Sequence, residues 1–364
     1  PSLSLPVPPP RGRGRPKKVS RGFKGFRPKK LDFSSVGESS KSVVHVDGVR
    51  DFPVRLQNEG VNVCFFNAIC QVLYSLPEFR RHVEETRSTR NMVTKFKNLF
   101  EEMEHTNGTV FTSAYVQGLE LSNYRYRMQH DAQEALAEIL NECYPETAES
   151  IFCVRVNESL SCTREQGGCG EVQRRYEFEQ MLKFEVREIA ETQSVDGILM
   201  SSFEDNMPSG YRCNLGADGG CGRIDTCKKA SHVEEVKDVL IIQLLIFTYD
   251  AEGNKRKIFP ALRIEQELDR YRLTGIVWHH GRNLDEGHYT SMVRYDETWF
   301  HMCDTEVDRF EIKFSCELGE EMVPYLLFYR RNDLIDLRDV PMSIETDYPV
   351  EPEGIDFHVH ESDV

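Results

Sequence analysis

The chain has 364 residues, a formal net charge of −15 and 39% apolar residues, enough for one large or two smaller domains with a well-formed core. No segment approaches the roughly 18 consecutive apolar residues of a membrane span, so we expect no membrane partner. Eleven cysteines, an odd number in a chain of this size, indicate a reducing compartment rather than a disulfide framework.

The first 48 residues differ in composition from the rest and predict a disordered basic arm. Residues 1–30 contain ten Lys or Arg and no Asp or Glu. Residues 11–18 read Arg-Gly-Arg-Gly-Arg-Pro-Lys-Lys and resemble an AT-hook, which places arginines in the minor groove of A·T-rich DNA. A nuclear localisation signal or a solvated tail explains the same residues. Either of the first two readings predicts nuclear residence, with the cytoplasm as a further location.

Cys64 stands where a glycine-bearing segment runs into an amphipathic helix. Apolar residues recur at helical spacing from 65 to 76, and Pro77 ends the pattern. We expect the helix N-terminus to lower the pKa of this thiol and to make it a better nucleophile. Asn58 and Asn62, just upstream, could donate to a developing oxyanion, although a turn or cap role also explains Asn62. Taken alone, the segment is equally compatible with a buried, inert cysteine.

Two further helices are expected near 90–103 and 131–144. Asp131 and Glu134 lie in the first turn of the second, where acidic side chains complement the helix dipole. The apolar residues of that helix share one face, and this arrangement leaves Asp131 free to face a groove.

Strand-like runs dominate the remainder of the chain. They lie at 151–161, 172–186, 239–249, 272–280, 287–295 and 323–330. A helical region followed by a strand-rich one predicts an α+β fold. Four cysteines fall between these runs in two pairs, with six and seven residues, several of them glycine, inside each pair: Cys162 and Cys169, then Cys213 and Cys221.

His288 begins one of these strands, beside Gly287, where a substrate backbone could approach closely. A Cys-His pair needs the imidazole near the sulfur and a third group that fixes the imidazole tautomer. Cys303 and Asp304 are the candidates for that third role. A core histidine and a turn aspartate are the simpler explanations of His288 and Asp304.

In this order, the segments resemble the ubiquitin-specific protease family of papain-like cysteine peptidases over roughly residues 52–331. Residues 56–67 resemble its cysteine box, Leu-x-Asn-x-Gly-x-Thr-Cys-Tyr-x-Asn, with one extra residue before the cysteine. Residues 287–307 follow its histidine box, which begins Gly-His-Tyr. Residues 129–134 match its Gln-x-Asp-Ala-x-Glu helix start, and residues 239–247 resemble its buried strand.

The resemblance implies a papain-like α+β catalytic domain at 49–335, followed by an acidic tail at 336–364. The domain would comprise a helical thumb at about 52–147, β fingers at about 150–240 and a β-rich palm formed by the remainder. The active site would lie between thumb and palm. Family members often carry a Cys-x-x-Cys pair at two places in the fingers, so we expect Cys162, Cys169, Cys213 and Cys221 to bind a structural zinc ion. A finger with reduced, metal-free cysteines is the alternative.

The resemblance also implies hydrolysis of the isopeptide or peptide bond after the C-terminal glycine of ubiquitin, with no catalytic cofactor. Cys64 would be the nucleophile and His288 the general base. Gly287 and Tyr289 would form walls of the cleft. The residues expected to face the ubiquitin tail, with Asp131 binding an arginine, are Gln129, Asp131 and Glu134.

Two departures from the family pattern affect these assignments. Cys303 stands where the family has the Asn or Asp that orients the histidine, and a thiol is a poor acceptor. We therefore expect Asp304 to orient His288, through a bulge or loop. The family's oxyanion asparagine lies five residues before the cysteine, whereas Asn58 lies six before and Asn62 two before. We favour Asn58, with the extra residue looped out near Gly60.

These departures leave two alternatives to an active deubiquitinase. One is a catalytically weak or inactive ubiquitin-binding module tethered to DNA by the basic arm. The other is a protease for a different ubiquitin-like modifier.

Overall fold

The computed structural model describes residues 53–334, except 59, 88–89, 107, 123, 190, 201–202, 208, 217–218, 250–252, 283–286, 296 and 311–321, together with a strand at 354–357. The basic arm at 1–48, with its AT-hook-like residues 11–18, lies outside the described residues. So does most of the acidic tail predicted at 336–364.

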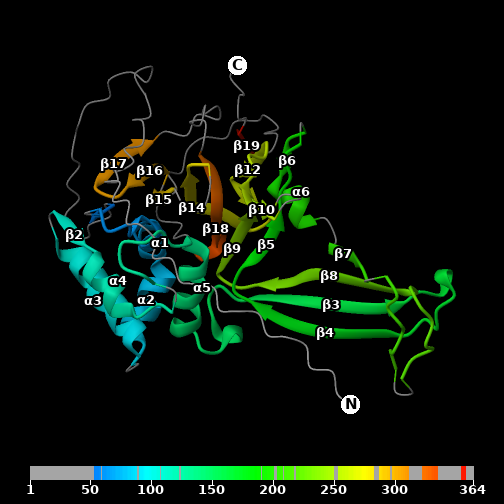
Figure 1. The fold of residues 1–364 in the computed structure, drawn as a ribbon. Coiled ribbons are helices and arrows are strands. Elements are labelled where there is room, and N and C mark those ends of the chain that lie inside the picture. The colour runs from blue at the N-terminus through cyan, green and yellow to red at the C-terminus, as the bar shows by residue number, and fades with distance from the viewer. Residues whose placement is uncertain are drawn as a thin grey trace, which may run out of the picture. The chain divides into compact units, whose positions relative to one another are not determined.

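Five α-helices occupy the N-terminal part of the described chain (Figure 1). They are α1 (Cys64–Ser75), α2 (Pro77–Glu85), α3 (Asn91–His105), α4 (Ser113–Leu119) and α5 (Ala132–Cys143). The helices predicted near 65–76, 90–103 and 131–144 are confirmed, whereas α2 and α4 were not predicted. Pro77 ends the apolar pattern of α1 as expected, but it also begins α2, because proline is well suited to the first turn of a helix.

The larger sheet has the strand order β17-β16-β15-β14-β18-β9-β5, with β13 paired to β14. Its strands are β5 (Leu182–Glu185), β9 (Val239–Leu245), β13 (Glu267–Leu268), β14 (Tyr271–His280), β15 (His288–Tyr295), β16 (Thr298–Cys303), β17 (Glu306–Phe310) and β18 (Val323–Arg331). All pairings are antiparallel except that of β5 with β9.

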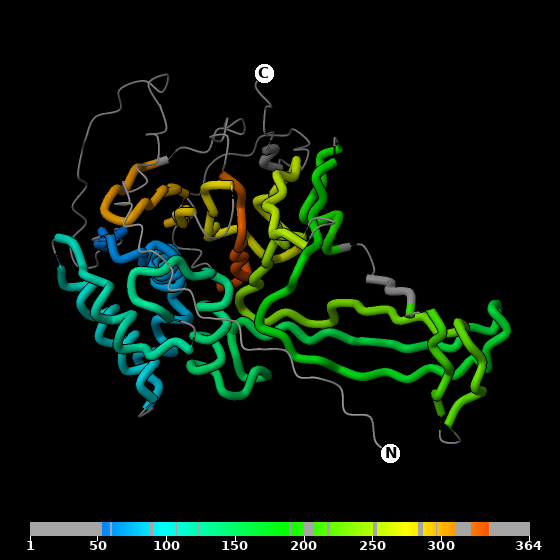
Figure 2. Tube along the Cα trace, in the orientation of Figure 1, coloured from blue at the N-terminus to red at the C-terminus, as the bar shows by residue number. Residues whose placement is uncertain are grey.

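Helix α1 packs against β14 and β15, so the first described helix contacts strands that lie about 200 residues later in the sequence (Figure 2). Nearly every residue of α1 is buried. Gly275 in β14 permits this close approach, because a Cβ atom there would lie 2.7 Å from Val72 Cγ1. This contact is what places Cys64 and the histidine-bearing strand β15 in one region.

A second, four-stranded sheet has the order β4-β3-β8-β7. Its strands are β3 (Val154–Cys162), β4 (Val172–Glu179), β7 (Phe203–Asn206) and β8 (Cys227–Val236). The single run predicted at 172–186 is therefore two strands in different sheets. β4 is largely exposed on both faces, whereas Leu182 and Phe184 of β5 enter the main core. β8 was not predicted, because its sequence is rich in lysine and glutamate.

Short elements complete the described fold. They are β1 (Arg55–Gln57) paired with β2 (Thr109–Phe111), β10 (Phe247–Tyr249) paired with β11 (Lys255–Lys257), the sheet of β6 (Gln193–Ser194), β12 (Leu262–Glu265) and β19 (Gly354–Phe357), helix α6 (Val195–Met200), and the 3-10 turns η1 (Thr147–Glu149), η2 (Arg164–Gln166) and η3 (Asn332–Leu334). Among the helices described, none has the length and apolar content needed to cross a membrane. The α+β prediction is confirmed.

Candidate active site and cysteine cluster

Cys64 is the first residue of α1, and its side chain is only 2% exposed. The segment before it is held by Asn58, whose side-chain oxygen accepts a 3.2 Å hydrogen bond from the Val63 amide. Gly60 and Asn62 both have left-handed backbones, with φ of 71° and 58°. The chain therefore turns twice between Asn58 and the helix, and Cys64 enters the core at the end of that turn.

Burial, and after it the negative charge of Asp304, raises the pKa of the Cys64 thiol to about 12. Backbone amides of Tyr289, Phe65 and Cys64 itself lower the pKa, but by less. The expectation that the helix N-terminus would lower this pKa is therefore wrong, because desolvation of a buried sulfur outweighs the helix dipole and the amides. Cys64 rests as a neutral thiol.

His288 is the first residue of β15, the strand that packs against α1. Its Nε2 lies 3.2 Å from Cys303 Sγ and 3.9 Å from Asp304 Oδ2. Burial lowers the pKa of His288, and the charge of Asp304 opposes this only in part. Within the described residues, His288 Nδ1 makes no hydrogen bond, and none joins the ring to Cys64. The resting pair is a neutral thiol and a neutral imidazole.

Asp304 lies in the tight turn between β16 and β17, with a left-handed φ of 54°. Its Oδ2 accepts a 3.0 Å hydrogen bond from Asn58 Nδ2, and its Oδ1 accepts a 2.7 Å bond from Asn67 Nδ2. Its backbone oxygen accepts a further bond from the Leu56 amide. The turn supplies the loop geometry that the sequence required, and Asp304 joins the histidine segment to the cysteine segment.

The structure separates the two candidate oxyanion donors. Asn58 lies beside Asp304 and the turn before Cys64. Asn62 points away from them and donates a 2.9 Å hydrogen bond to the Arg127 carbonyl. Arg127 is itself left-handed, with φ of 64°, so Asn62 fixes a strained turn in the loop before α5. Of the two, Asn58 is the residue at the candidate site.

Asn67 belongs to the same network and was not singled out from the sequence. It is 3% exposed, and its side-chain oxygen accepts a hydrogen bond from the Thr112 hydroxyl while its amide donates to Asp304. A polar residue one turn into an otherwise apolar helix was the signal that could have identified it.

Asp131 is partly buried, and its carboxylate already accepts hydrogen bonds from within the protein. It caps α5, accepting hydrogen bonds from the Gln133 and Glu134 amides. The Tyr325 hydroxyl, which is 2.9 Å from both carboxylate oxygens, donates to the same group. Burial raises the pKa of Asp131, although the hydroxyl and the two amides oppose the rise. Glu134 is exposed and Gln129 is half-buried, so both remain accessible.

Gly287 is half-buried, whereas Tyr289 is buried. Tyr289 is 2% exposed, and its ring contacts those of His279 and Tyr325 at 5.0 and 6.1 Å. A Cβ atom at Gly287 would lie 2.3 Å from His279 Nε2, so glycine is required there by the neighbouring imidazole. The expectation that the Tyr289 side chain forms a wall of the cleft is wrong, whereas its backbone amide does reach the Cys64 sulfur.

The four cysteines predicted as metal ligands come together at the end of the second sheet. Their sulfur atoms all lie within 4.8 Å of one another: Cys162, Cys169, Cys213 and Cys221. The Cys162–Cys221 and Cys169–Cys213 sulfur distances are 3.7 and 3.9 Å. Four thiolates at about 2.3 Å from a tetrahedral ion would be about 3.8 Å apart, so this cluster could hold a metal ion without rearrangement.

The loops that carry these cysteines are shaped by hydrogen bonds to sulfur and by glycine. The Cys169 amide donates to Cys162 Sγ at 3.3 Å, and Thr226 Oγ1 lies 3.1 Å from the same sulfur. A Cβ atom at Gly168 would lie 2.3 Å from Cys162 Sγ, so the loop closes only with glycine. The amides of Gly170 and Gly222 donate to the backbone carbonyls of Cys162 and Cys213 rather than to sulfur.

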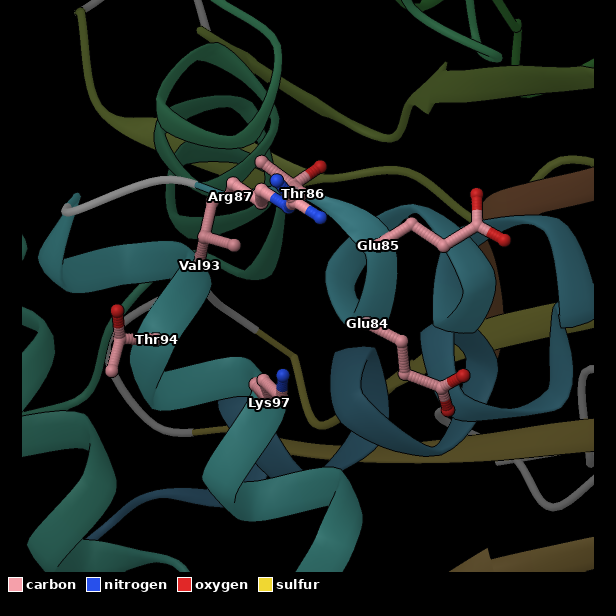
Figure 3. Close-up of a pocket in the computed structure, with 7 residues that line it drawn as sticks. All are labelled: Glu84, Glu85, Thr86, Arg87, Val93, Thr94 and Lys97. Atoms are coloured by element: carbon pink, nitrogen blue, oxygen red, sulfur yellow. The ribbon is translucent and has the colours of Figure 1, made fainter.

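Two shallow pockets lie on the helical part of the chain, away from these two sites. The larger, of about 630 Å³, lies between the end of α2 and α3 and is lined by Glu84, Glu85, Thr86, Arg87, Val93, Thr94 and Lys97 (Figure 3). The other is lined by four residues of α3. Neither contains a predicted site residue.

Comparison with known proteins gives a family match. The family model described as ubiquitin carboxyl-terminal hydrolase matches residues 54–329, which include every described candidate of the active site and of the cysteine cluster. The α+β architecture agrees with the papain-like fold of that family.

Individual relatives are more distant. A probable ubiquitin carboxyl-terminal hydrolase 3 of Schizosaccharomyces pombe is 33% identical over 136 residues, covering 29% of this chain and 27% of the relative. Ubiquitin C-terminal hydrolase 12 of Arabidopsis thaliana is 24% identical over 324 residues, covering 74% of this chain and 27% of the relative. Ubiquitin carboxyl-terminal hydrolase 10-B of Xenopus laevis is 26% identical over 133 residues, covering 31% and 16%. The chain thus matches about a quarter or less of the length of these relatives.

Proposed function

The chain belongs to the ubiquitin carboxyl-terminal hydrolase family, and from that premise we propose that it is a thiol-dependent enzyme that cleaves the isopeptide or peptide bond after the C-terminal glycine of ubiquitin. The observation that carries the proposal is the joining of two distant segments at Asp304. Its carboxylate bonds to Asn58 and lies 3.9 Å from the imidazole of His288, while α1 presents Cys64 beside strand β15.

The reaction would begin from the neutral pair. The Cys64 proton passes to Nδ1 of His288 as the sulfur attacks the glycine carbonyl carbon. The imidazolium then gives this proton to the leaving amine, and an acyl-enzyme remains on Cys64. Water, deprotonated by the same imidazole, hydrolyses it. Because both groups start neutral, charge appears only as the reaction proceeds, and a donor at the oxyanion is correspondingly important.

Asn58 would be that donor. One of its two amide hydrogens is bound by Asp304, which fixes the plane of the amide and leaves the other hydrogen for the substrate oxygen. We expected Asp304 to orient His288, but its carboxylate lies 3.9 Å from Nε2, beyond hydrogen-bond distance, and would instead stabilise the imidazolium through its charge. Asn62, bonded to Arg127, would take no part in this step.

Glu134 and Gln129 would bind the substrate tail near the start of α5. Glu134 is exposed and carries the charge that would attract an arginine. Asp131 would contribute its residual accepting capacity, because each oxygen of an ionised carboxylate can accept more than one hydrogen bond. In domain terms, we propose the helices up to residue 147 as the thumb, the four-stranded sheet as the fingers and the larger sheet as the palm.

The cysteine cluster would hold a structural zinc ion. All four ligands are protein thiols and no position is left open, which is the arrangement of a structural rather than a catalytic site. The ion would tie the loops at the end of the four-stranded sheet together and supply no chemistry to the reaction.

The basic arm would act separately from the catalytic domain. We propose that residues 11–18 contact A·T-rich DNA and that the protein resides in the nucleus, on the sequence alone. Loss of duplex binding with rising salt, and stronger binding to A·T-rich than to G·C-rich duplex, would support this. Equal binding to both would favour a targeting signal or a solvated tail.

The decisive experiment is incubation with ubiquitin that carries an electrophile at its C-terminus. We expect one covalent adduct, located at Cys64 by mass spectrometry and absent in Cys64→Ala, together with hydrolysis of a fluorogenic ubiquitin amide. Binding of ubiquitin without adduct or turnover would identify an inactive binding module. An adduct with another ubiquitin-like modifier alone would change the substrate class.

A further inference from the structure

His288 has two possible partners at its Nε2 atom, and only one of them is within hydrogen-bond distance. Cys303 Sγ lies 3.2 Å away, a short contact for an N–S pair. The nearest Asp304 oxygen lies 3.9 Å away, which is too far for a hydrogen bond. Cys303 ends strand β16, opposite Glu306 in β17, so this strand pair fixes its position.

The carboxylate of Asp304 is already committed elsewhere. Oδ2, the oxygen nearer to His288, accepts from Asn58 at 3.0 Å, and Oδ1 accepts from Asn67 at 2.7 Å. These two amides come from the segment before α1 and from α1 itself. Moving the carboxylate toward the imidazole would weaken both bonds. The Asp304 carboxylate therefore bonds to the two asparagines, and the Cys303 thiol is the group that contacts His288.

We propose that Cys303 is the positioning residue for His288 in this chain, accepting a hydrogen bond from Nε2–H and so leaving Nδ1 unprotonated for the Cys64 thiol. The inference rests on the proposed thiol-protease function. A sulfur acceptor selects the same tautomer as a carboxylate would, but it provides no charge opposite the imidazolium.

The surroundings of Cys303 keep it neutral. Burial raises the pKa of its thiol to about 12, and the charges of Asp304 and Glu306 act in the same direction. Cys303 therefore offers lone pairs to the imidazole rather than a thiolate. We therefore expect Cys303 to select the tautomer of His288, as a carboxylate would, but to stabilise the imidazolium less than a carboxylate would.

Three substitutions at this position test the proposal, with hydrolysis of the fluorogenic ubiquitin amide as the assay. Cys303→Ala should lower kcat about tenfold at unchanged KM, the effect of losing one neutral hydrogen bond. Cys303→Asn, a better neutral acceptor, should restore or exceed the wild-type kcat. Cys303→Asp should raise kcat and move the acid limb of the kcat/KM profile to higher pH, because a carboxylate raises the pKa of the adjacent imidazole. Equal kcat and pH profiles in all four proteins would overturn the proposal.

A second measurement does not depend on turnover. In the wild-type protein, ¹⁵N chemical shifts of His288 should report the Nε2–H tautomer, and Cys303→Ala should lose that preference while retaining the thermal unfolding midpoint. A wild-type Nδ1–H tautomer would overturn the proposal whether or not the protein is active. If the wild type shows the expected tautomer but neither turns over nor forms the ubiquitin adduct, the proposed function fails and the placement of Cys303 stands.

Discussion

Two groups of cysteines in this chain show what decides the protonation of a thiol. Cys64 begins a helix and has three amides near its sulfur, yet its pKa is raised to about 12. Cys162 lies in the cluster at the end of the four-stranded sheet. Burial raises its pKa, but hydrogen bonds, chiefly from the Thr226 hydroxyl and the Cys169 amide, lower it more, to about 6. The backbone amide of Leu215 likewise lowers the pKa of Cys213, whereas the pKa of Cys169 is raised to about 11, because the effect of the Glu171 amide is outweighed by burial and by its cysteine neighbours.

A neighbouring charge adds to the difference on the side of Cys64. The Asp304 carboxylate raises the pKa of Cys64, because it disfavours a second negative charge. In the cluster, the interactions that lower the pKa of Cys162 and of Cys213 are hydrogen bonds to their sulfur atoms. A helix N-terminus is therefore insufficient to ionise a cysteine whose surroundings are dry and acidic.

The comparison predicts that loss of Cys64 affects turnover alone and that loss of a cluster cysteine affects zinc binding and stability. The loss of turnover is the largest effect we expect. Cys64→Ala should lower turnover of a ubiquitin amide by about 10⁵-fold or more, with bound zinc and the thermal unfolding midpoint unchanged. Cys213→Ala should reduce bound zinc below half an equivalent and lower the unfolding midpoint, because structural metal binding contributes directly to folding. Metal loss in Cys64→Ala, or a full equivalent of zinc in Cys213→Ala, would show that the division is wrong.

The reactivity of Cys64 toward a small reagent should be the next largest effect. With a pKa of about 12 in place of 9.0, its thiolate fraction at pH 7.5 is about 10³-fold lower than that of an ordinary cysteine. Alkylation by iodoacetamide, followed at the Cys64 peptide by mass spectrometry, should be slower by a similar factor. The rate should continue to rise tenfold per pH unit up to about pH 11, with free cysteine as the control. A plateau below pH 8 would instead indicate a thiolate–imidazolium pair.

The loss of activity at acid pH should follow from protonation of His288. The pKa of His288 is lowered from 6.5 by burial, so the neutral base persists below pH 6.5 and is lost only as the pH falls through the lowered value. The kcat/KM profile of the wild type should therefore retain activity at pH 6.5 and decline below it. An acid limb above pH 6.5 would mean that Asp304 outweighs burial at the imidazole.

Substitution of the two asparagines before Cys64 tests which of them donates to the oxyanion. Asn58→Ala should lower kcat by about 10²- to 10³-fold, the usual effect of losing one oxyanion donor. Asn62→Ala is the matched control, because it removes an amide of the same size that bonds only to the Arg127 carbonyl. Its kcat should change by less than tenfold. Similar losses in both variants would indicate that the loop held by Asn62, rather than a donor at Asn58, controls the rate.

The sequence was sufficient where a periodic pattern or an ordered motif was present. Helices α1 and α5 and strands β14, β15 and β18 follow their apolar patterns closely. The family resemblance, with two cysteine pairs in the fingers, predicted a cluster whose sulfurs do converge. Strand β8 was missed because it is stabilised by cross-strand ion pairs, such as that between Lys229 and Glu158, rather than by an apolar face.

The sequence was insufficient where a few degrees of backbone rotation decide the contacts of a side chain. Residues 303 and 304 should face opposite sides of a strand, but the positive φ of Asp304 brings both toward His288. Whether Tyr289 forms a cleft wall or part of the core depends on its contacts with His279 and Tyr325, which are distant in sequence. Desolvation of Cys64 has the same origin, since β15 covers the helix start.

The smallest effect we expect is that of removing the Thr226 hydroxyl, which contacts a sulfur of the cysteine cluster. Thr226 is 4% exposed and lies 3.1 Å from Cys162 Sγ, so Thr226→Val removes this contact at nearly constant volume. Zinc affinity, measured by competition with a chromogenic chelator, should fall by about 10- to 100-fold, as is usual for groups that orient a metal ligand. Thr163→Val is the matched control, because that hydroxyl bonds to Gln166 and to the Thr226 carbonyl but to no sulfur. Equal affinities in the two variants would mean that the Thr226 hydroxyl does not hold Cys162 ready to bind the metal, and the lowered pKa of Cys162 would then rest on the backbone amide.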